Sequence, residues 1–298
     1  GTVVKFYPGS SSSSSRYDAK LVVEGELEAY GTAGENIVFT AYTDDAHGGD
    51  TNGDGSSSSP VSRYWHGIRV EGAAVMEHCK VLYAGYDNEF DTYEDYTTTA
   101  RAGVYVSNAT ATIRSCYVAD NYYGIWVTGS GSYETVVEYN TVFSNDSTGL
   151  QIPYLSSAVN GNVISGNGGS GIWVGGSSAT NTSITANTIE NNGGSGISLS
   201  GCSPTITSNT VEGNDTALSH SGSSFPTYSG NTIINNNRQC ISIKGTISGD
   251  GTWADVEGLG MPYVVTGETT VSTGATLTIP AGTVVKFYPG SSSSSSRY

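Results

Sequence analysis

The stretch from Val137 to Asn145 reads VEYNTVFSN, and close copies of it follow along the chain. The copies are VNGNVISGN (Val159–Asn167), ITANTIENN (Ile184–Asn192) and ITSNTVEGN (Ile206–Asn214). Each has an apolar residue, an Asn three positions later, an apolar residue two after that, and a second Asn three after that. A fixed pattern that returns at short intervals is typical of a repeat protein, in which each repeat is one structural unit.

The spacing of the first Asn in this pattern gives the length of the repeat. Copies with one change each begin at Ile113 and Tyr228, and in two early copies a Cys takes the place of the Asn. The positions are Cys79, Cys116, Asn140, Asn162, Asn187, Asn209 and Asn231. After a first interval of 37 residues, the steps are 24, 22, 25, 22 and 22 residues. This length is too short for a propeller blade and fits one coil of a parallel solenoid, in which Asn side chains stack and hydrogen-bond from coil to coil.

A second motif runs in phase with the first. GIRV at Gly67 returns as GVYV, GIWV, GLQI, GIWV and GISL, beginning at Gly103, Gly124, Gly149, Gly171 and Gly196. Because alternate residues of a strand face opposite sides, the second and fourth residues should face inward, for example Ile125, Val127, Ile172 and Val174. A degenerate copy at Ala217 puts His220 at an inward position. We expect His220 to be a hydrogen-bonded core histidine and not a metal ligand.

The pattern predicts an all-β solenoid of about ten coils. Residues Gly67–Lys244 resemble the secreted right-handed parallel β-helix repeat proteins of the pectate-lyase-like superfamily. The flanks, YVVTGETTVSTGATLTIPAGTVVKF (Tyr263–Phe287) and LVVEGELEAYGTAGENIVFTAY, are similar to entry coils of large bacterial and archaeal surface proteins of this type. The resemblance implies a right-handed parallel β-helix that is extracellular or on the cell surface.

The two ends of the chain carry the same sequence. Residues 1–17 and 282–298 both read GTVVKFYPGSSSSSSRY, at an offset of 281. Chance does not produce this identity, so we expect a tandem array with a 281-residue unit; the alternative is an overlap introduced when the sequence was assembled. The expected organisation is entry coils with Ser-rich and acidic insertions in residues 1–66, central coils in 67–245, and entry coils of the next unit in 246–298.

The charge balance restricts the partners. The net charge is −15, with only 12 Lys and Arg and no basic stripe, which excludes nucleic acid and anionic membrane surfaces as expected partners. No apolar run approaches the ~20 residues of a membrane span, so no membrane insertion is expected. The expected partners are further copies of the chain, head to tail along a fibre axis, with lateral fibre contacts or glycans as additional candidates.

An acidic insertion is the candidate metal site. Insertions at Asp44–Pro60 and Tyr86–Tyr96 each lie between the last strand of one coil and the first strand of the next, so both should emerge at one edge. The first contains DTNGDG, which places Asp50, Asn52 and Asp54 at alternate positions, as in the opening of a Ca²⁺ loop.

The insertion departs from the complete EF-hand loop, because its twelfth position is Val61 and not Glu. Further ligands would come from Asp44, Asp45, backbone carbonyls or the second insertion. The alternative is a solvated acidic turn without a metal ion.

An aromatic row and a cysteine pair complete the candidate residues. Tyr105, Trp126 and Trp173 face outward on the strands of the second motif, where they could stack on sugar rings, contact another protein or be covered by a loop. The outward row carries no carboxylate, so an enzyme is not expected, and a polysaccharide lyase or hydrolase is the minority hypothesis. Cys79 and Cys116 hold one ladder position in adjacent coils, about 4.8 Å apart, which suits a disulfide or two stacked free thiols.

Together these features favour a structural function. We expect a repeat unit of an extracellular filament or of a giant cell-surface fibre or adhesin, with Ca²⁺ stiffening one edge. The alternative is a secreted carbohydrate-binding β-helix, or less readily a carbohydrate-cleaving one.

Overall fold

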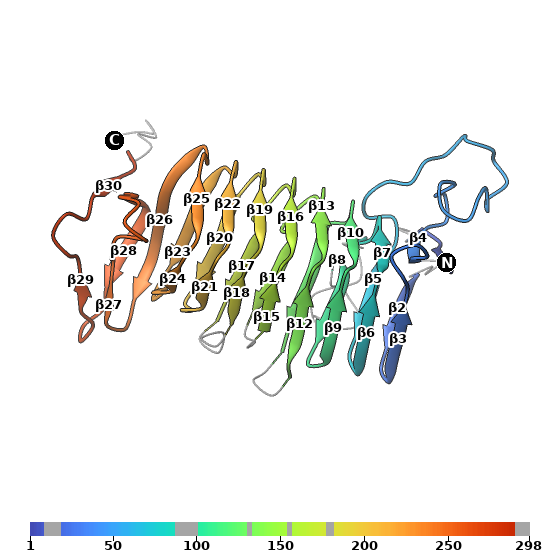
Figure 1. Cartoon of the computed structure of the whole chain (residues 1–298), viewed down its shortest axis with the longest axis horizontal. Coiled ribbons are helices and arrows are strands. Elements are labelled where there is room, and N and C mark those ends of the chain that lie inside the picture. Colours follow the sequence, from blue (N-terminus) through green and yellow to red (C-terminus); the bar gives the residue numbers. More distant parts are fainter. Residues whose placement is uncertain (9–18, 87–100, 130–132, 154–156, 177–181, 290–298) are drawn as a thin grey trace, which may run out of the picture.

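The chain folds as an elongated stack of parallel coils in a computed structural model (Figure 1). The structure describes residues 1–8, 19–86, 101–129, 133–153, 157–176 and 182–289. Every regular element in these ranges is a β-strand, and the two ends of the chain lie at opposite ends of the stack (Figure 1). The fold is therefore the predicted all-β, right-handed parallel β-helix.

Three long sheets, here called A, B and C, run along the stack, and every pairing in them is parallel. Sheet B has eleven strands: β2 (Lys20–Val23), β5 (Gly67–Val70), β8 (Ala102–Ser107), β11 (Tyr123–Thr128), β14 (Leu150–Pro153), β17 (Ile172–Gly175), β20 (Ser195–Ser200), β23 (Thr216–Ser221), β26 (Arg238–Ile247), β28 (Tyr263–Val271) and β30 (Val285–Phe287). Its strands contain the second sequence motif.

Sheets C and A follow sheet B in each coil. Sheet C has β3 (Glu26–Tyr30), β6 (Ala73–Glu77), β9 (Thr110–Arg114), β12 (Thr135–Glu138), β15 (Ser157–Asn160), β18 (Ser183–Thr185), β21 (Thr205–Thr207) and β24 (Thr227–Ser229). Sheet A has β1 (Val3–Phe6), β4 (Ile37–Ala41), β7 (Cys79–Leu82), β10 (Tyr117–Ala119), β13 (Thr141–Phe143), β16 (Val163–Ser165), β19 (Thr188–Glu190), β22 (Thr210–Glu212) and β25 (Thr232–Ile234). Strands β27 (Gly251–Thr252) and β29 (Leu277–Thr278) form a separate pair.

Strands β2 to β25 make eight complete coils, each passing from sheet B to C to A. Beyond β25 only sheet B continues, through β26, β28 and β30. The expected number of about ten is therefore slightly too high for complete coils, because in the last turns the described chain has no strand that joins sheets A and C.

The core is a set of stacked apolar ladders between the sheets. The predicted inward residues Ile125, Val127, Ile172 and Val174 are all at most 1% exposed. Full burial of one such side chain contributes roughly 1.5–3 kcal/mol, so the ladders supply the main driving force for folding. His220 is also buried, and its Nε2 lies 2.8 Å from the Tyr228 hydroxyl, as expected for a hydrogen-bonded core histidine.

Two ladders of buried Asn side chains hold the turns together. At a typical rung, the backbone N–H and the Nδ2 of Asn162 both donate to Asn187 Oδ1 at 2.9 Å, and Asn187 Nδ2 donates to the Val159 carbonyl at 3.0 Å. One ladder runs through Asn140, Asn162, Asn187, Asn209 and Asn231, and the other through Asn121, Asn145, Asn167, Asn192, Asn214 and Asn236. Each Asn satisfies turn groups that would otherwise be buried without partners.

Other polar groups end these ladders. At the C-terminal side, the Asn231 N–H donates to the Glu257 carboxylate at 3.0 Å and the Asn236 N–H donates to Gln239 Oε1 at 3.2 Å. At the N-terminal side, the Cys79 N–H points to the Cys116 sulfur at 3.4 Å. Both cysteines are buried free thiols, so of the two alternatives the structure contains the stacked thiols and not the disulfide.

No helix in the described part of the chain is long and apolar enough to cross a membrane.

Candidate functional site: an acidic loop

The acidic insertion forms the long connection between β4 and β5 and projects from the N-terminal end of the stack (Figure 1). It leaves the coil where sheet A gives way to sheet B. The second insertion joins β7 to β8 and so starts from the same edge, as predicted. Apart from Tyr86, that insertion lies outside the described residues, and so do the Ser-rich segments at residues 10–15 and 291–296.

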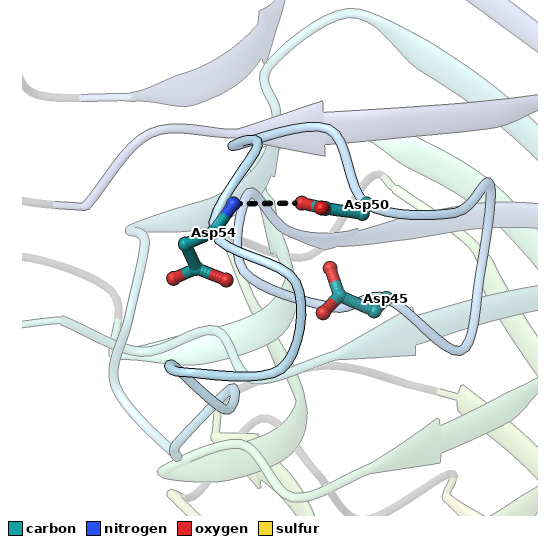
Figure 2. A group of neighbouring side chains, drawn as sticks. All are labelled: Asp45, Asp50 and Asp54. Carbon is teal, nitrogen blue, oxygen red and sulfur yellow. Dashed lines mark hydrogen bonds between the residues drawn. The ribbon is translucent and has the colours of Figure 1, made fainter.

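Three carboxylates come together in this loop. Asp45, Asp50 and Asp54 each place a carboxylate oxygen within 4.8 Å of the other two (Figure 2). This is the one group of three or more His, Cys, Asp and Glu side chains with metal-binding spacing among the described residues. Carboxylate oxygens are the ligands that Ca²⁺ prefers.

Asp50 organises the loop through backbone hydrogen bonds. Its carboxylate accepts N–H bonds from Gly53 at 2.7 Å, from Asp54 at 3.2 Å and from Gly55 at 2.9 Å. Figure 2 shows the bond from Asp54. These bonds, that from Gly55 first, lower the pKa of Asp50 below its usual value. Gly53 and Gly55 both have φ of 72°, a left-handed conformation that glycine adopts without strain.

Several oxygens of the loop are left without a donor. Asp45 Oδ1, Asn52 Oδ1 and Asp54 Oδ1 are shielded from solvent, and the described residues provide no hydrogen-bond partner for any of them. A shielded carboxylate oxygen without a donor is unfavourable, and a bound cation would relieve this cost. The positions predicted for Asp45, Asp50, Asn52 and Asp54 are therefore compatible with a hard cation.

Asp44 has a different role from the one predicted. It is 1% exposed and accepts hydrogen bonds from Thr40 Oγ1 at 2.6 Å and from the Ala46 N–H at 3.2 Å. His47 Nδ1 lies 2.8 Å from the same carboxylate. Asp44 thus holds the base of the loop and does not join the three-carboxylate group; the sequence spacing could not distinguish it from Asp45.

The loop also packs against the first strand of the chain. Lys5 Nζ donates to the Gly49 carbonyl at 2.6 Å, and the rings of Tyr7 and Tyr42 stack with centroids 4.3 Å apart. The Tyr42 hydroxyl donates to the Thr51 carbonyl at 3.0 Å. The acidic loop is therefore connected to β1, which belongs to the sequence repeated at both ends.

The predicted aromatic row is interrupted at Gln151 and is only partly exposed. Tyr105 pairs with Trp126 in register, and Gln151 separates Trp126 from Trp173. Tyr105 is only 7% exposed, and its ring meets that of Trp126 edge-on at 5.6 Å. Tyr105 is thus not the open contact residue that was expected, and the two tryptophans are half-buried.

A cavity near the C-terminal end was not predicted. It measures about 280 Å³ and is lined in part by His220, Tyr228, Trp253, Glu257 and Tyr263. Burial lowers the pKa of His220 to about 3, so the ring is neutral. The sequence signal was the polar His220 at an inward position, but the opposing residues come from later turns without a repeat pattern.

The chain belongs to the NosD family, described as "Periplasmic copper-binding protein", whose model matches residues 53–267. A search of curated proteins gave no match. The fold of the chain is similar to that of the Dettilon tailspike protein, with 13% identity and a TM-score of 0.49 over 96% of this chain and 60% of that chain.

Two further solved structures are similar. A periplasmic alginate epimerase, AlgG, has 13% identity and a TM-score of 0.45, over 92% of this chain and 71% of that chain. A pectate lyase has 14% identity and a TM-score of 0.40, over 94% of this chain and 78% of that chain. Identities this low carry no information about a shared activity.

The described residues do not fit the copper of the family description. Proteins bind copper mainly through imidazole, thiolate and thioether groups, whereas the acidic loop offers carboxylates. Cys79 and Cys116 are adjacent soft ligands, but their sulfurs lie within hydrogen-bond range of buried backbone carbonyls, among them those of Ala29 and Met76. Among the described residues, no third His, Cys, Asp or Glu side chain joins this pair at metal-binding spacing.

Proposed function

We propose that this chain is a repeat unit of a secreted or periplasmic β-helix rod, in which successive units stack end to end. The observation that carries the proposal is the identity of residues 1–17 and 282–298 at the two ends of one solenoid. Partner strands cover one edge of β1 and one edge of β30, so each has a second edge on which a further parallel strand can pair. A solenoid grows by this kind of addition without a change of fold.

The rest of the described molecule supports a structural task. The Asn ladders and apolar ladders run through the central coils without a break, and each coil stabilises its neighbours. The outward row of sheet B contains Arg69, Tyr105, Trp126, Gln151 and Trp173 in its first half and no carboxylate in its described part. This row therefore lacks the acid–base pair that glycoside cleavage needs.

Electron microscopy of a two-unit chain tests the rod. The chain would continue residue 298 with residues 18–298, so that the repeated segment stands once at the junction. Adjacent coils lie ~4.8 Å apart, so about ten turns per unit give a straight rod that lengthens by roughly 50 Å per unit. Two separately oriented particles joined by a flexible link would contradict the proposal.

The acidic loop is proposed to bind Ca²⁺ and to stiffen the N-terminal edge of each unit. Three converging carboxylates and the shielded, donor-free oxygens of Asp45 and Asp54 support this assignment. The loop is attached to β1 through Lys5, so an ordered loop would also hold the first strand in place.

A further inference from the structure

We propose that the repeated segment forms one strand that two successive units share, with β28 of one unit on one edge and β4 of the next unit on the other. As a consequence, each unit advances by a non-integral number of turns. This inference rests on the proposed rod and specifies the contact between its units. The partner is a second copy of this chain.

The two described copies of the segment already make the two halves of this contact. In the N-terminal copy, β1 pairs with the strand that follows it, and Val4 lies opposite Phe39. In the C-terminal copy, β30 pairs with the strand that precedes it, and Val285 lies opposite Tyr263. Val4 and Val285 are the same position of the repeat, because the offset is 281.

The two copies use different backbone groups. In the N-terminal copy, the carbonyls of Thr2 and Phe6 accept the N–H groups of Val38 and Tyr42. In the C-terminal copy, Val284 O accepts the Tyr263 N–H, and the Tyr288 N–H donates to Val265 O. Val284 and Tyr288 correspond to positions 3 and 7 of the repeated segment, because the offset is 281. Strand β28 therefore bonds to positions 3 and 7, whereas β4 bonds to positions 2 and 6.

This alternation is what a strand inside a parallel sheet requires. Along such a strand, successive residues direct their polar groups to the neighbour on one side and then to the neighbour on the other. One copy of the segment can therefore bond to β28 and β4 at the same time, without competition for any N–H or C=O. Inward residues elsewhere in the stack also direct their backbone groups to the following strand, as the Ile125 N–H does to the Gly149 carbonyl, so the segment follows the pattern of the regular coils.

The side chains agree as well. Phe6 and Phe287 are the same repeat position, and their register partners are Ala41 and Val265. Phe6 stacks on Trp65 with ring centroids 3.9 Å apart, so it faces the core. Phe287 is 76% exposed at the open end of the stack. In a shared strand, Trp65 of the next unit would cover this ring, which removes a large exposed apolar group.

The sheets that contain β1 and β30 determine how many turns of the solenoid separate successive units. From β2 to β30, sheet B has eleven strands in succession, which span ten turns. The segment starts one face earlier, because β1 lies in sheet A and β2 follows it in sheet B. From one copy to the next the chain thus makes ten turns and one third of a turn, and sheet B of one unit continues as sheet A of the next.

The extra third of a turn per unit determines on which face of the rod each acidic loop lies. Each loop packs on its own β1 through the Lys5–Gly49 contact, so its position follows the shared strand. Successive loops would emerge from successive faces of the rod and return to the first face after three units. Equal charges along the rod are then separated by one face as well as by one unit length, which reduces their repulsion.

Cryo-electron microscopy of a four-unit chain tests the phase. We expect a continuous rod whose first three acidic loops lie on three different faces and whose fourth lies on the face of the first. A continuous rod with all loops on one face would overturn the shared-strand phase and leave the rod itself intact. Units that do not stack at all would overturn both proposals.

Two proline substitutions test whether one strand pairs with both units. Proline removes one N–H, which a free edge tolerates and a paired edge does not. The register directs the Lys286 N–H towards β28 and the Val285 N–H away from it. In the 298-residue chain, Lys286→Pro should release β30 and Val285→Pro should not. At the junction of the two-unit chain, both should speed chymotrypsin cleavage at least about tenfold, because cleavage follows local opening.

The decisive comparison is Val285→Pro in the two chains, since only a shared strand uses both edges. If this substitution leaves the junction of the two-unit chain as resistant as that of the unchanged chain, the shared strand is wrong. The 298-residue chain with the same substitution is the matched control, because its edge at this position is open.

Discussion

The central coils and the two ends of this solenoid satisfy the buried polar groups of their turns in different ways. Between β11 and β25 the turns that enter and leave sheet A are closed by Asn side chains that hydrogen-bond to the coils above and below. At the ends this regularity stops: Cys79 and Cys116 begin one ladder, and Glu257 and Gln239 terminate the two ladders. The repeated Asn side chains thus satisfy one another in the centre, whereas the ends of the ladders depend on single Cys, Glu and Gln side chains.

This difference separates the residues that stabilise the fold from the residues to which a function is proposed. A ladder position is fixed by its neighbours, so the same residue recurs and little variation is tolerated. The acidic loop, the cavity beside His220 and the open strand edges all lie outside the regular ladders. The features to which we assign a proposed role, the acidic loop and the open strand edges, therefore lie where the repeat is interrupted.

Breaking the central ladder should have the largest effect. In Asn187→Ala, the N–H and Nδ2 of Asn162 lose their acceptor, and the carbonyl of Val159 loses a donor. Several buried groups left unsatisfied should lower the free energy of unfolding by about 3–5 kcal/mol, measured by urea denaturation. Asn160→Ala is the control: this half-buried Asn makes one long bond to Tyr139 Oη, so a change within about 0.5 kcal/mol is expected. Equal losses in both variants would contradict the ladder as a source of stability.

The buried histidine should make the C-terminal region sensitive to acid. Burial lowers the folded-state pKa of His220 to about 3, below its ordinary value of 6.5, so between these values the unfolded chain binds a proton that the folded chain does not. Its contribution is complete above pH 6.5 and is lost as pH falls towards 3. Between pH 7.5 and 4.5 this loss amounts to about 2–3 kcal/mol.

The double variant His220→Leu, Tyr228→Phe removes both partners of the hydrogen bond, so neither is left unsatisfied. Urea denaturation at both pH values should show that the variant loses less stability on acidification than the unchanged protein. Tyr228→Phe alone retains the histidine and should keep the full pH dependence. An identical pH dependence in all three proteins would show that His220 is not responsible.

Much of this division could be predicted from the sequence. The ladders, the parallel coil and the inward residues follow from side-chain periodicity, because each rung repeats the environment of the last, whereas the division of each coil among three sheets came only from the structure. The loop contacts do not repeat: Asp44 binds Thr40 and His47, while Asp45 approaches Asp50 and Asp54. Likewise the partial burial of Tyr105 and the cavity beside His220 depend on contacts between non-equivalent turns. Periodicity predicts neither.

Calcium should stabilise the N-terminal end by a smaller amount. At a free Ca²⁺ concentration ten times the dissociation constant, binding should raise the free energy of unfolding by about 1.4 kcal/mol. Calorimetric titration should show saturable binding that the double variant Asp45→Asn, Asp54→Asn loses. Asp50 is retained because it holds the loop backbone. Asp215→Asn, which removes a carboxylate paired with Arg238 far from the loop, should bind Ca²⁺ as the unchanged protein does.

The smallest effect is expected where the ladder begins. Cys116 accepts from the Cys79 N–H through its sulfur, and its own N–H donates to Asn140 Oδ1 at 2.9 Å. An Asn at this position could accept the same N–H through its side-chain oxygen and donate to the Met76 carbonyl, to which the Cys116 sulfur now lies at 3.4 Å. Cys116→Asn should therefore extend the ladder by one rung, and stability measured by urea denaturation should stay within about 1 kcal/mol of the unchanged protein.

Cys116→Ala is the comparison for this substitution, because it offers no acceptor to the Cys79 N–H and leaves a cavity. It should be less stable than Cys116→Asn. If the alanine variant is the more stable of the two, the start of the ladder is determined by the packing of the thiol pair and not by its hydrogen bonds. In that case the space available for the side chain, and not its hydrogen bonds, determines where the Asn ladder begins, and an Asn fits only where the coil is wide enough to hold it.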